Sequence, residues 1–378
     1  MYQLFYSDDG YYTGGVIYDP RAADYAILDG KLTQKLNTAG TLTFTLPPGR
    51  GDPLSHRGVL LRDRGETLFS GRILKTETDF EGFATVTCEG LLGELNGFVV
   101  RPYDFSGEDA QAADSTINYL NTLLSSALAV QDGAWAMGEC SESLKKLDYS
   151  LRSSSLYPAL LTEIQQKLIQ KQGGYLRARI DPAAYNQITR YLDYVIEDDY
   201  GTLVNQPIEL GKNLIDLEIT VDSSDRINIL VPLGKTGEDG QRLTVRNAVV
   251  DGKVYGKDYL EKEGSVARYY AISATNQWED VTDPTNLYNK AVEYLESASQ
   301  TAVSISASAA DLSLAGYDVS PIRLGDRVRL ISKVHGLDMT MLCTQRTYDL
   351  LDPAKDVIKL ESQLSAQNLT DLFAATGR

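Results

Sequence analysis

Two stretches of this sequence, far apart along the chain, repeat one pattern of short apolar segments separated by turns. The segments of the first stretch are 59–61, 69–73 and 85–89, and those of the second are 328–330, 341–346 and 357–361. Glycine and aspartate interrupt both stretches, as in Asp63-Arg64-Gly65 and Leu324-Gly325-Asp326. Such segments are typical of antiparallel strands joined by hairpins. The sequence therefore predicts two related β units, an internal duplication within one chain.

Length and apolar content allow several folded domains. The chain has 378 residues, of which 43% are hydrophobic, and at roughly 100–200 residues per domain we expect about two to four domains. No segment approaches the ~20 apolar residues that cross a bilayer. The N-terminus also lacks the basic and apolar regions of a signal peptide. We therefore expect a soluble protein without membrane insertion.

The charge of the chain bears on its partners. The formal net charge is −16 at pH 7, and most of the acidic excess lies within 101–300. Such a chain repels phosphate groups, which disfavours tight binding of nucleic acid, although DNA could slide past an acidic surface.

The order of predicted elements divides the chain into four regions. Residues 1–100 are β-rich, 101–205 are mixed α+β, 206–235 together with 302–378 form the second β unit, and 236–301 are an insertion with one helix. The β texture of the first region is clearest at 41–46, where Leu42, Phe44 and Leu46 alternate with threonines, as in a half-buried strand. We expect an α+β, β-rich, multidomain protein.

Helix and hairpin signals mark the middle of the chain. Apolar residues at helical spacing predict one helix over 117–128 and another that begins near Pro158 and ends at Gly173-Gly174. The insertion helix is expected to begin at Asp283-Pro284. Segments 217–221 and 227–232, separated by a polar turn, predict a hairpin that opens the second β unit.

Cysteines and histidines give no support for a metal site or a nucleophilic enzyme. The three cysteines, Cys88, Cys140 and Cys343, are too widely spaced for a metal knuckle or a disulfide framework. Cys88 and Cys343 fall within predicted strands, where buried structural thiols are expected. His56 and His335 have no second histidine or cysteine at metal or triad spacing. A histidine-based hydrolase is therefore not expected.

Three other patterns have ordinary structural interpretations. The acidic run 197–199 lacks the ligand spacing of an EF-hand, which favours a solvated turn. Gly14-Gly15 and Gly234-Lys235-Thr236-Gly237 resemble pieces of a phosphate loop but lack its spacing, which favours turns. The 23 tyrosines fit β-propensity as well as a sugar-binding surface. Paired carboxylates for glycoside cleavage stay open. We assign no catalytic, cofactor-binding or metal-binding residue and expect no cofactor.

Six ordered segments carry a resemblance to a known family. They are 36–48 (LNTAGTLTFTLPP), 68–73 (LFSGRI), 86–95 (VTCEGLLGEL), 211–217 (GKNLIDL), 231–234 (VPLG) and 322–328 (IRLGDRV). In this order and spacing the chain resembles the tail-associated, or baseplate-hub, proteins of phages and prophages of Gram-positive bacteria. The resemblance implies two tail-tube-like antiparallel β-barrel domains, a mixed α+β domain and a smaller inserted domain. It also implies a homotrimer, whose six similar units match a sixfold tail tube.

The resemblance sets further expectations about location and partners. It implies a structural protein, not an enzyme, that is made in the host cytoplasm and sits at the virion tail tip or baseplate. The implied partners are further copies of the chain, the distal tail or tail tube protein, and other tail-tip or receptor-binding proteins, with DNA only in passage. Many relatives carry a C-terminal endopeptidase or fibre domain, whereas this chain resembles the hub portion alone. Two alternatives remain open: a tail-associated cell-wall hydrolase, and a tail protein that binds host polysaccharide.

Overall fold

The structure is a computed structural model that describes most of the chain. The described residues are 1–7, 14–50, 58–104, 115–128, 135–144, 153–154, 156–183, 187–237, 240–279, 281–300 and 302–365. The chain forms two compact units. Unit 1 comprises 1–216, 307–333 and 338–361, and unit 2 comprises 217–306, 334–337 and the residues from 362 onward.

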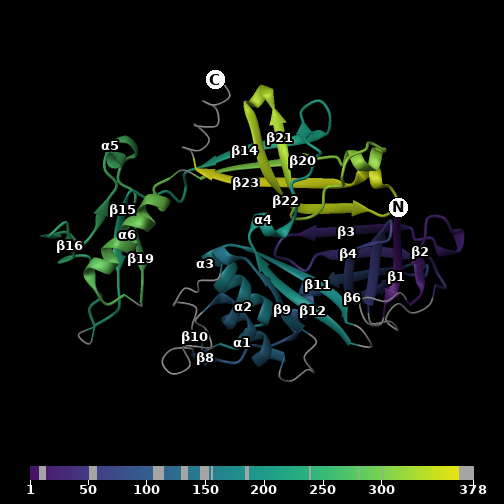
Figure 1. Ribbon diagram of the computed structural model, residues 1–378, viewed down its shortest axis with the longest axis horizontal. Coiled ribbons are helices and arrows are strands. Elements are labelled where there is room, and N and C mark those ends of the chain that lie inside the picture. Colours follow the sequence, from purple (N-terminus) through teal and green to yellow (C-terminus); the bar gives the residue numbers. More distant parts are fainter. Residues whose placement is uncertain are drawn as a thin grey trace. The chain divides into compact units, whose positions relative to one another are not determined.

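A large sheet of 13 strands dominates the part of the chain that the structure describes (Figure 1). Its strands are β1 (Tyr2–Ser7), β2 (Val16–Tyr18), β3 (Asp29–Lys35), β4 (Thr41–Leu46), β5 (Gly58–Asp63), β6 (Glu66–Thr78), β7 (Ala84–Gly90), β13 (Ile208–Glu209), β14 (Leu214–Asp222), β20 (Ala302–Ala309), β21 (Arg327–Ser332), β22 (Leu337–Asp349) and β23 (Val357–Ser365). They follow the order β14-β20-β23-β22-β3-β4-β7-β6-β5-β1-β2, with β21 next to β22 and β13 next to β21.

The strand order contains the same arrangement twice. The first repeat is β3-β4-β7-β6-β5, and the second repeat is β14-β20-β23-β22-β21. The central strands of the repeats, β6 and β22, both have 13 residues. Each pairs antiparallel with the strand that follows it, and each pairing shifts register once, between Ile73 and Lys75 in β6 and between Cys343 and Gln345 in β22. The predicted duplication is confirmed at the level of strand order.

Backbone crowding within the first repeat explains one residue of the LFSGRI segment. A Cβ atom on Gly71 would lie 2.2 Å from the carbonyl oxygen of Glu89 and 2.6 Å from the ring of Phe69. Both distances are far below van der Waals contact, so only glycine fits this crossing of strands. In the same repeat, β4 pairs with β7 and buries Leu42, Phe44 and Leu46, which confirms the predicted alternation.

A mixed α+β region follows the first repeat in unit 1. Its sheet has the order β11-β12-β9, and helices pack against it around a core that includes Tyr119, Leu161 and Leu192. The elements are α1 (Thr116–Leu128), β9 (Trp135–Cys140), α2 (Leu160–Ile164), the π turn η7 (Gln165–Ile169), α3 (Gln170–Gln172), β11 (Tyr175–Ala183) and β12 (Gln187–Val195). Both predicted helices are confirmed. The second ends at Gly173, whose φ of 74° suits glycine.

Unit 2 contains a small sheet covered by one long helix. The sheet has the order β18-β15-β19, and the helix α6 packs on it through Leu287, Ala291 and Leu295. Asp283 caps α6 as predicted, because its carboxylate accepts the amide hydrogens of Thr285 and Asn286. The elements are β15 (Ile229–Leu233), β16 (Val249–Val250), β17 (Lys253–Val254), β18 (Leu260–Glu261), the additional short helix α5 (Ser265–Tyr269), β19 (Ser273–Gln277) and α6 (Pro284–Ala298).

The predicted hairpin over 217–221 and 227–232 is wrong. The polar turn forms, since the carboxylate of Asp222 accepts the Ser224 amide hydrogen, but the strands on its two sides belong to different sheets. β14 pairs with β20 in the large sheet, whereas β15 pairs with β18 and β19. The reason is burial: Ile227 and Leu230 lie in the core beneath α6, which draws β15 away from β14.

Short elements complete the fold. They are η1 (Ala23–Tyr25), η3 (Leu91–Gly97), β8 (Tyr103–Asp104), η5 (Glu142–Leu144), β10 (Ser153–Ser154), α4 (Glu197–Tyr200), η8 (Leu312–Ala315), η9 (Lys333–His335) and η10 (Pro353–Lys355). The prediction of a β-rich α+β protein is confirmed. Closure of the repeats into two barrels and the division into four regions stay predictions. Within the described ranges, no helix combines the length and apolarity needed to cross a bilayer.

Candidate assembly surface

The two repeats meet in unit 1 through one pair of strands (Figure 1). The C-terminal half of β22 pairs antiparallel with β3, from Gln345 opposite Lys35 to Asp349 opposite Lys31. On its other edge β22 pairs with β23. We call this contact, with the turn between β22 and β23 and the strand β1, the repeat interface. It joins both repeats into one continuous sheet.

Leu350 is the apolar centre of the repeat interface. It follows β22 directly and is only 2% exposed, within the core that the first repeat builds around Ile27, Leu32 and Phe44. Its amide donates to the carbonyl oxygen of Gly30 at 2.8 Å. A Cβ atom on Gly30 would lie 3.0 Å from the Leu350 side chain, so the glycine leaves room for the leucine.

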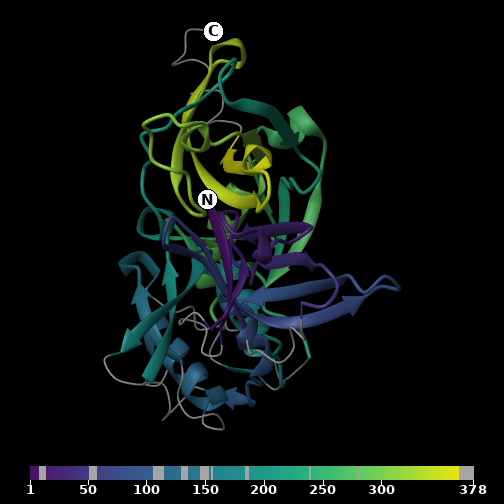
Figure 2. The same ribbon diagram turned by 90° about the vertical axis from the view of Figure 1, so that its right-hand side faces the viewer.

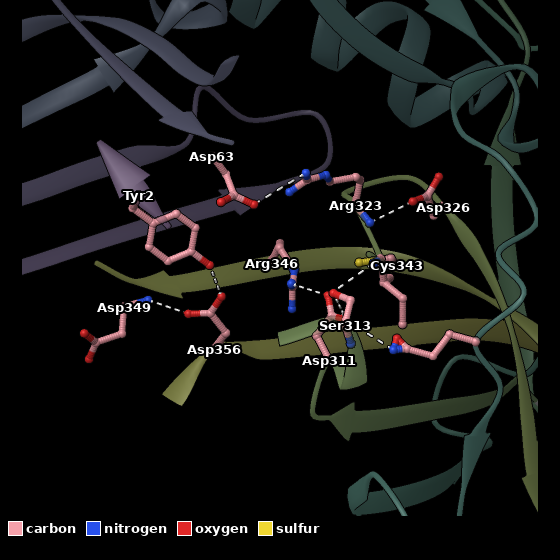
Figure 3. Close-up of polar contacts among 12 residues, drawn as sticks. Tyr2, Asp63, Asp311, Ser313, Arg323, Asp326, Cys343, Arg346, Asp349 and Asp356 are labelled. Carbon is pink, nitrogen blue, oxygen red and sulfur yellow. Dashed lines mark hydrogen bonds and ion pairs between the residues drawn. The ribbon is translucent and has the colours of Figure 1, made fainter. Parts of the chain in front are cut away.

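A tyrosine–aspartate pair fastens the N-terminal strand to the same turn (Figure 3). The Tyr2 hydroxyl donates to one carboxylate oxygen of Asp356, and the amide of Asp349 donates to the other at 2.8 Å. Burial raises the pKa of Asp356 to about 6, although these hydrogen bonds and the nearby Arg346 work in the opposite direction. Burial and the neighbouring carboxylate raise the pKa of Tyr2, so the phenol keeps its proton and acts as the donor.

A buried ion pair lies beside this contact. Arg346 on β22 donates from Nη2 to Asp311 at 2.7 Å, and the two side chains are 1% and 0% exposed. Burial alone would lower the pKa of Arg346, but Tyr348, Asp311 and Asp356 outweigh it and raise that pKa. Asp311 also accepts hydrogen bonds from the side chains of Gln206 and Ser313 and from the Ser313 and Ile322 amides. This carboxylate therefore holds β22 against the segment after β20 and the turn before β21.

The Leu324-Gly325-Asp326 motif forms the turn that leads into β21. Asp326 accepts the backbone amides of Thr202 at 2.9 Å and Arg323 at 2.7 Å. Gly325 has a φ of 81°, and a Cβ atom there would lie 1.9 Å from the ring of Tyr200. The motif is thus explained by turn geometry and close packing. From the same turn, Arg323 reaches Glu66 of the first repeat at 3.1 Å.

Two edges of the large sheet correspond to the edges that meet in the repeat interface. β3, the first strand of its repeat, lies between β4 and β22, whereas β14, its counterpart, has β20 as its single neighbour among the described strands. β22 pairs with β21 along its first half and with β3 along its second half. In the first repeat, β6 pairs with β5 along its first half, but no described strand pairs with the β5 side of its last residues, Lys75–Thr78. We call these the β14 edge and the β6 edge.

The residues that the sequence analysis considered for chemistry and set aside do not come together in the described structure. His56 lies outside the described residues, and His335 is an exposed residue in η9. The acidic run 197–199 forms α4 instead of a solvated turn, where Asp198 pairs with Arg327 and Asp199 accepts from Ser141. The described residues contain no cluster of three or more residues suited to hold a metal ion.

The remaining motifs are structural. The predicted turn at 234–237 is wrong: the amides of Gly234 and Gly237 donate to the carbonyl oxygens of Leu243 and Gln241, and Thr236 forms an antiparallel bridge with Arg242. These amides are used in backbone pairing, as in a strand. Cys88 and Cys343 are both buried, as predicted, and burial raises the pKa of each thiol to about 12. The residues of the repeat interface escaped detection in the sequence, because the register shift in β22 conceals which of its side chains face inward.

Comparisons with known proteins agree with this architecture. Residues 204–370 match the family model described as prophage endopeptidase tail. The fold is similar to that of a prophage tail protein, gp18, of Listeria monocytogenes (TM-score 0.53, 12% identity, covering 99% of this chain and 98% of that one). It is also similar to a 43 kDa tail protein of prophage MuSo2 of Shewanella oneidensis (0.56, 11%, 95% and 97%) and to a tail protein of Neisseria meningitidis (0.55, 14%, 99% and 99%). No curated protein sequence matches the chain. The chain therefore shares its fold, over nearly its whole length, with phage tail proteins.

Proposed function

We propose that the protein is a structural component of a phage or prophage tail, a hub at the tail tip that assembles as a ring of three copies. The observation that carries the proposal is the doubled strand order with two matching edges. Within one chain the second repeat pairs with the first through β22 and β3. The counterpart of β22 in the first repeat is β6, and the counterpart of β3 in the second repeat is β14. These two strands form the β6 edge and the β14 edge.

Pairing of the β6 edge with the β14 edge of another copy repeats the intrachain contact. A heterologous contact of this kind forms a closed ring when the rotation that relates one copy to the next is a whole fraction of a full turn. Three copies with two repeats each present six similar units, which matches the symmetry of a sixfold tail tube. Exposed sheet edges are also a hazard for uncontrolled association, and ring closure removes them.

The proposal extends to partners and passage. The ring would join or close the distal end of the tail tube, contact the distal tail or tube protein and receptor-binding proteins, and open when DNA leaves. The net charge of −16 for each copy suits a channel that repels phosphate and does not retain DNA.

The test is the mass of the purified chain and its place in the particle. Light scattering across a concentration series is expected to reach three times the protomer mass of 41.6 kDa. Labelling of the chain in assembled tails is expected to mark the tip. A chain that remains monomeric at every concentration and is missing from tails would contradict the proposal.

Two observations motivate rival functions. The matching family model is described as an endopeptidase tail, so release of soluble fragments from purified cell wall, lost on substitution of one carboxylate, would favour a hydrolase. In unit 2, a hollow of about 460 Å³ is lined by Lys235, Arg242 and Arg246 together with polar side chains. Binding of host-wall polysaccharide that disappears in Arg242→Ala would favour a receptor-binding role.

A further inference from the structure

The turns that follow β6 and β22 begin in the same way. Asp79 lies as far beyond the register shift of β6 as Asp349 lies beyond that of β22. Oδ1 of Asp79 accepts the amide hydrogen of Glu81 at 3.0 Å, and Oδ1 of Asp349 accepts that of Leu351 at 3.1 Å. The residue after each aspartate is apolar. Phe80 therefore occupies the position in the first repeat that Leu350 occupies in the second.

These two side chains have opposite environments. Leu350 is 2% exposed and lies in the core of the neighbouring repeat, whereas Phe80 is 106% exposed. In Figure 2 the hairpin of β6 and β7, in blue to indigo, extends away from the rest of its repeat. A phenylalanine has a large apolar surface that gains most from burial in an interface. The position of Phe80 matches that of an anchor whose receiving surface belongs to another molecule.

The tip that carries Phe80 is ordered in advance. A second bond to Oδ1 of Asp79 comes from the Phe83 amide at 2.9 Å, and the Asp79 amide donates to the Phe83 carbonyl oxygen at 3.0 Å. Gly82, with a φ of 89°, completes the turn. Because the backbone is already fixed, burial of the ring would cost little conformational entropy.

The repeat order identifies the receiving surface. Leu350 is buried beside β3, and β14 is the strand that occupies the place of β3 in the second repeat. Ile215 and Val221 lie on the same face of β14, because residues an even number apart point to the same side, and they are 62% and 61% exposed. β14 thus offers an apolar face at the position that the duplication requires.

We propose that Phe80 is an intermolecular anchor that packs against β14 of a second copy, as Leu350 packs beside β3 within one chain. The inference rests on the proposed ring and adds to it the residue and the strand that make the contact. Acidic side chains lie near both partners, Glu81 beside the ring and Asp216 on β14, whereas Glu77 forms an ion pair with Lys75 at 2.8 Å. The apolar contact therefore has to outweigh like-charge repulsion, which salt screens.

The first test compares two exposed aromatic residues in the full chain at physiological salt. Phe80→Ser is expected to weaken protomer association by at least about 30-fold, the effect of losing an interface hot spot. Tyr270→Ser removes another aromatic ring, 87% exposed, from unit 2 and is expected to leave association unchanged. Below the protein concentration at which the parent chain associates, thermal unfolding of both variants is expected to match the parent, because neither ring contributes to the core. Equal association of Phe80→Ser and the parent would overturn the anchor.

The second test identifies the receiving strand and separates this inference from the ring itself. A photoreactive benzoyl-phenylalanine in place of Phe80 is expected to crosslink to a peptide that contains Leu214–Asp222 of another copy. A trimer whose crosslinks map elsewhere would overturn the anchor and leave the ring standing. A parent chain that never associates would overturn both.

Discussion

Loss of the buried cation at the repeat interface should destabilise unit 1 strongly. The change is Arg346→Met, which keeps much of the side-chain volume and removes the charge. In the parent protein the guanidinium lies 2.7 Å from Asp311. After the substitution the Asp311 carboxylate would remain buried without a counterion, and breaking a buried pair in this way costs about 3–5 kcal/mol.

The surroundings place the expected value at the lower end of that range. Asp311 keeps its hydrogen bonds from Gln206, Ser313 and Ile322, which stabilise the remaining negative charge. Nε and Nη1 of Arg346 have no hydrogen-bond partner in the described structure, so their removal relieves part of the cost. We expect a loss of about 3 kcal/mol in the free energy of unfolding, or roughly 6–12 °C in Tm.

Tryptophan fluorescence can report on unit 1 alone. The chain contains two tryptophans, of which Trp135 is buried in unit 1 and Trp278 lies in unit 2. In a Trp278→Phe background, denaturant unfolding followed by fluorescence therefore measures unit 1. The expected result for Arg346→Met is a lower midpoint with an unchanged slope.

The matched control is Arg329→Met on the neighbouring strand β21. Arg329 forms a bidentate pair with Asp338, but the two side chains are 58% and 41% exposed. Solvent screens such a pair, so we expect no measurable change in the midpoint. If Arg346→Met and Arg329→Met unfolded at the same denaturant concentration, the reasoning from burial would be refuted.

Three further outcomes follow from the same structure. Because burial raises the pKa of Asp356 to about 6, above an unfolded value of about 3.9, the native state binds the extra proton and loses stability as pH rises between these values. Asp356→Asn should therefore gain roughly 2–3 kcal/mol relative to the parent between pH 4 and pH 7, measured by denaturant unfolding, and a pH-independent difference would contradict it. Gly325→Ala should unfold at a lower temperature than Gly316→Ala, because both glycines have positive φ but only the first would clash, with Tyr200. Iodoacetamide should label Cys140 in the native protein ahead of the two buried strand cysteines, a pattern that peptide mass spectrometry reads directly.

Local sequence patterns predicted many of the individual strands and helices. The alternation at 41–46 predicted β4, and the apolar spacing with Asp283 before Pro284 predicted α6, because each signal depends on neighbours in sequence. The duplication was also visible, since the turns and strands recur in order. Strand pairing between distant segments leaves no such trace, which is why the contact of β22 with β3 and the divergence of β14 from β15 were not predicted.

A register shift concealed the polar residues of the repeat interface. Along β22, Met341 and Cys343 face inward, and strict alternation would then place Arg346 and Tyr348 outside. The shift between Cys343 and Gln345 inserts one residue, so both side chains turn inward and are buried. From the sequence, an arginine within a strand is expected to be exposed. Only the structure shows that Arg346 is buried with Asp311 as its partner.

The two repeats differ in the side chains along and after their central strands, and the reason we infer is that one contact lies within a single chain whereas the other joins separate copies. The register shifts align Arg346 with Thr76 and Tyr348 with Thr78, so the first repeat lacks the buried cation and phenol of the second. Within one chain the covalent link supplies a high effective concentration. A leucine and buried polar pairs, which fix register but add little net affinity, therefore suffice there. Two separate copies have no such link, and their contact must also offset the entropy of association. This difference favours a larger apolar side chain than leucine, held on a rigid turn, as Phe80 is in the first repeat.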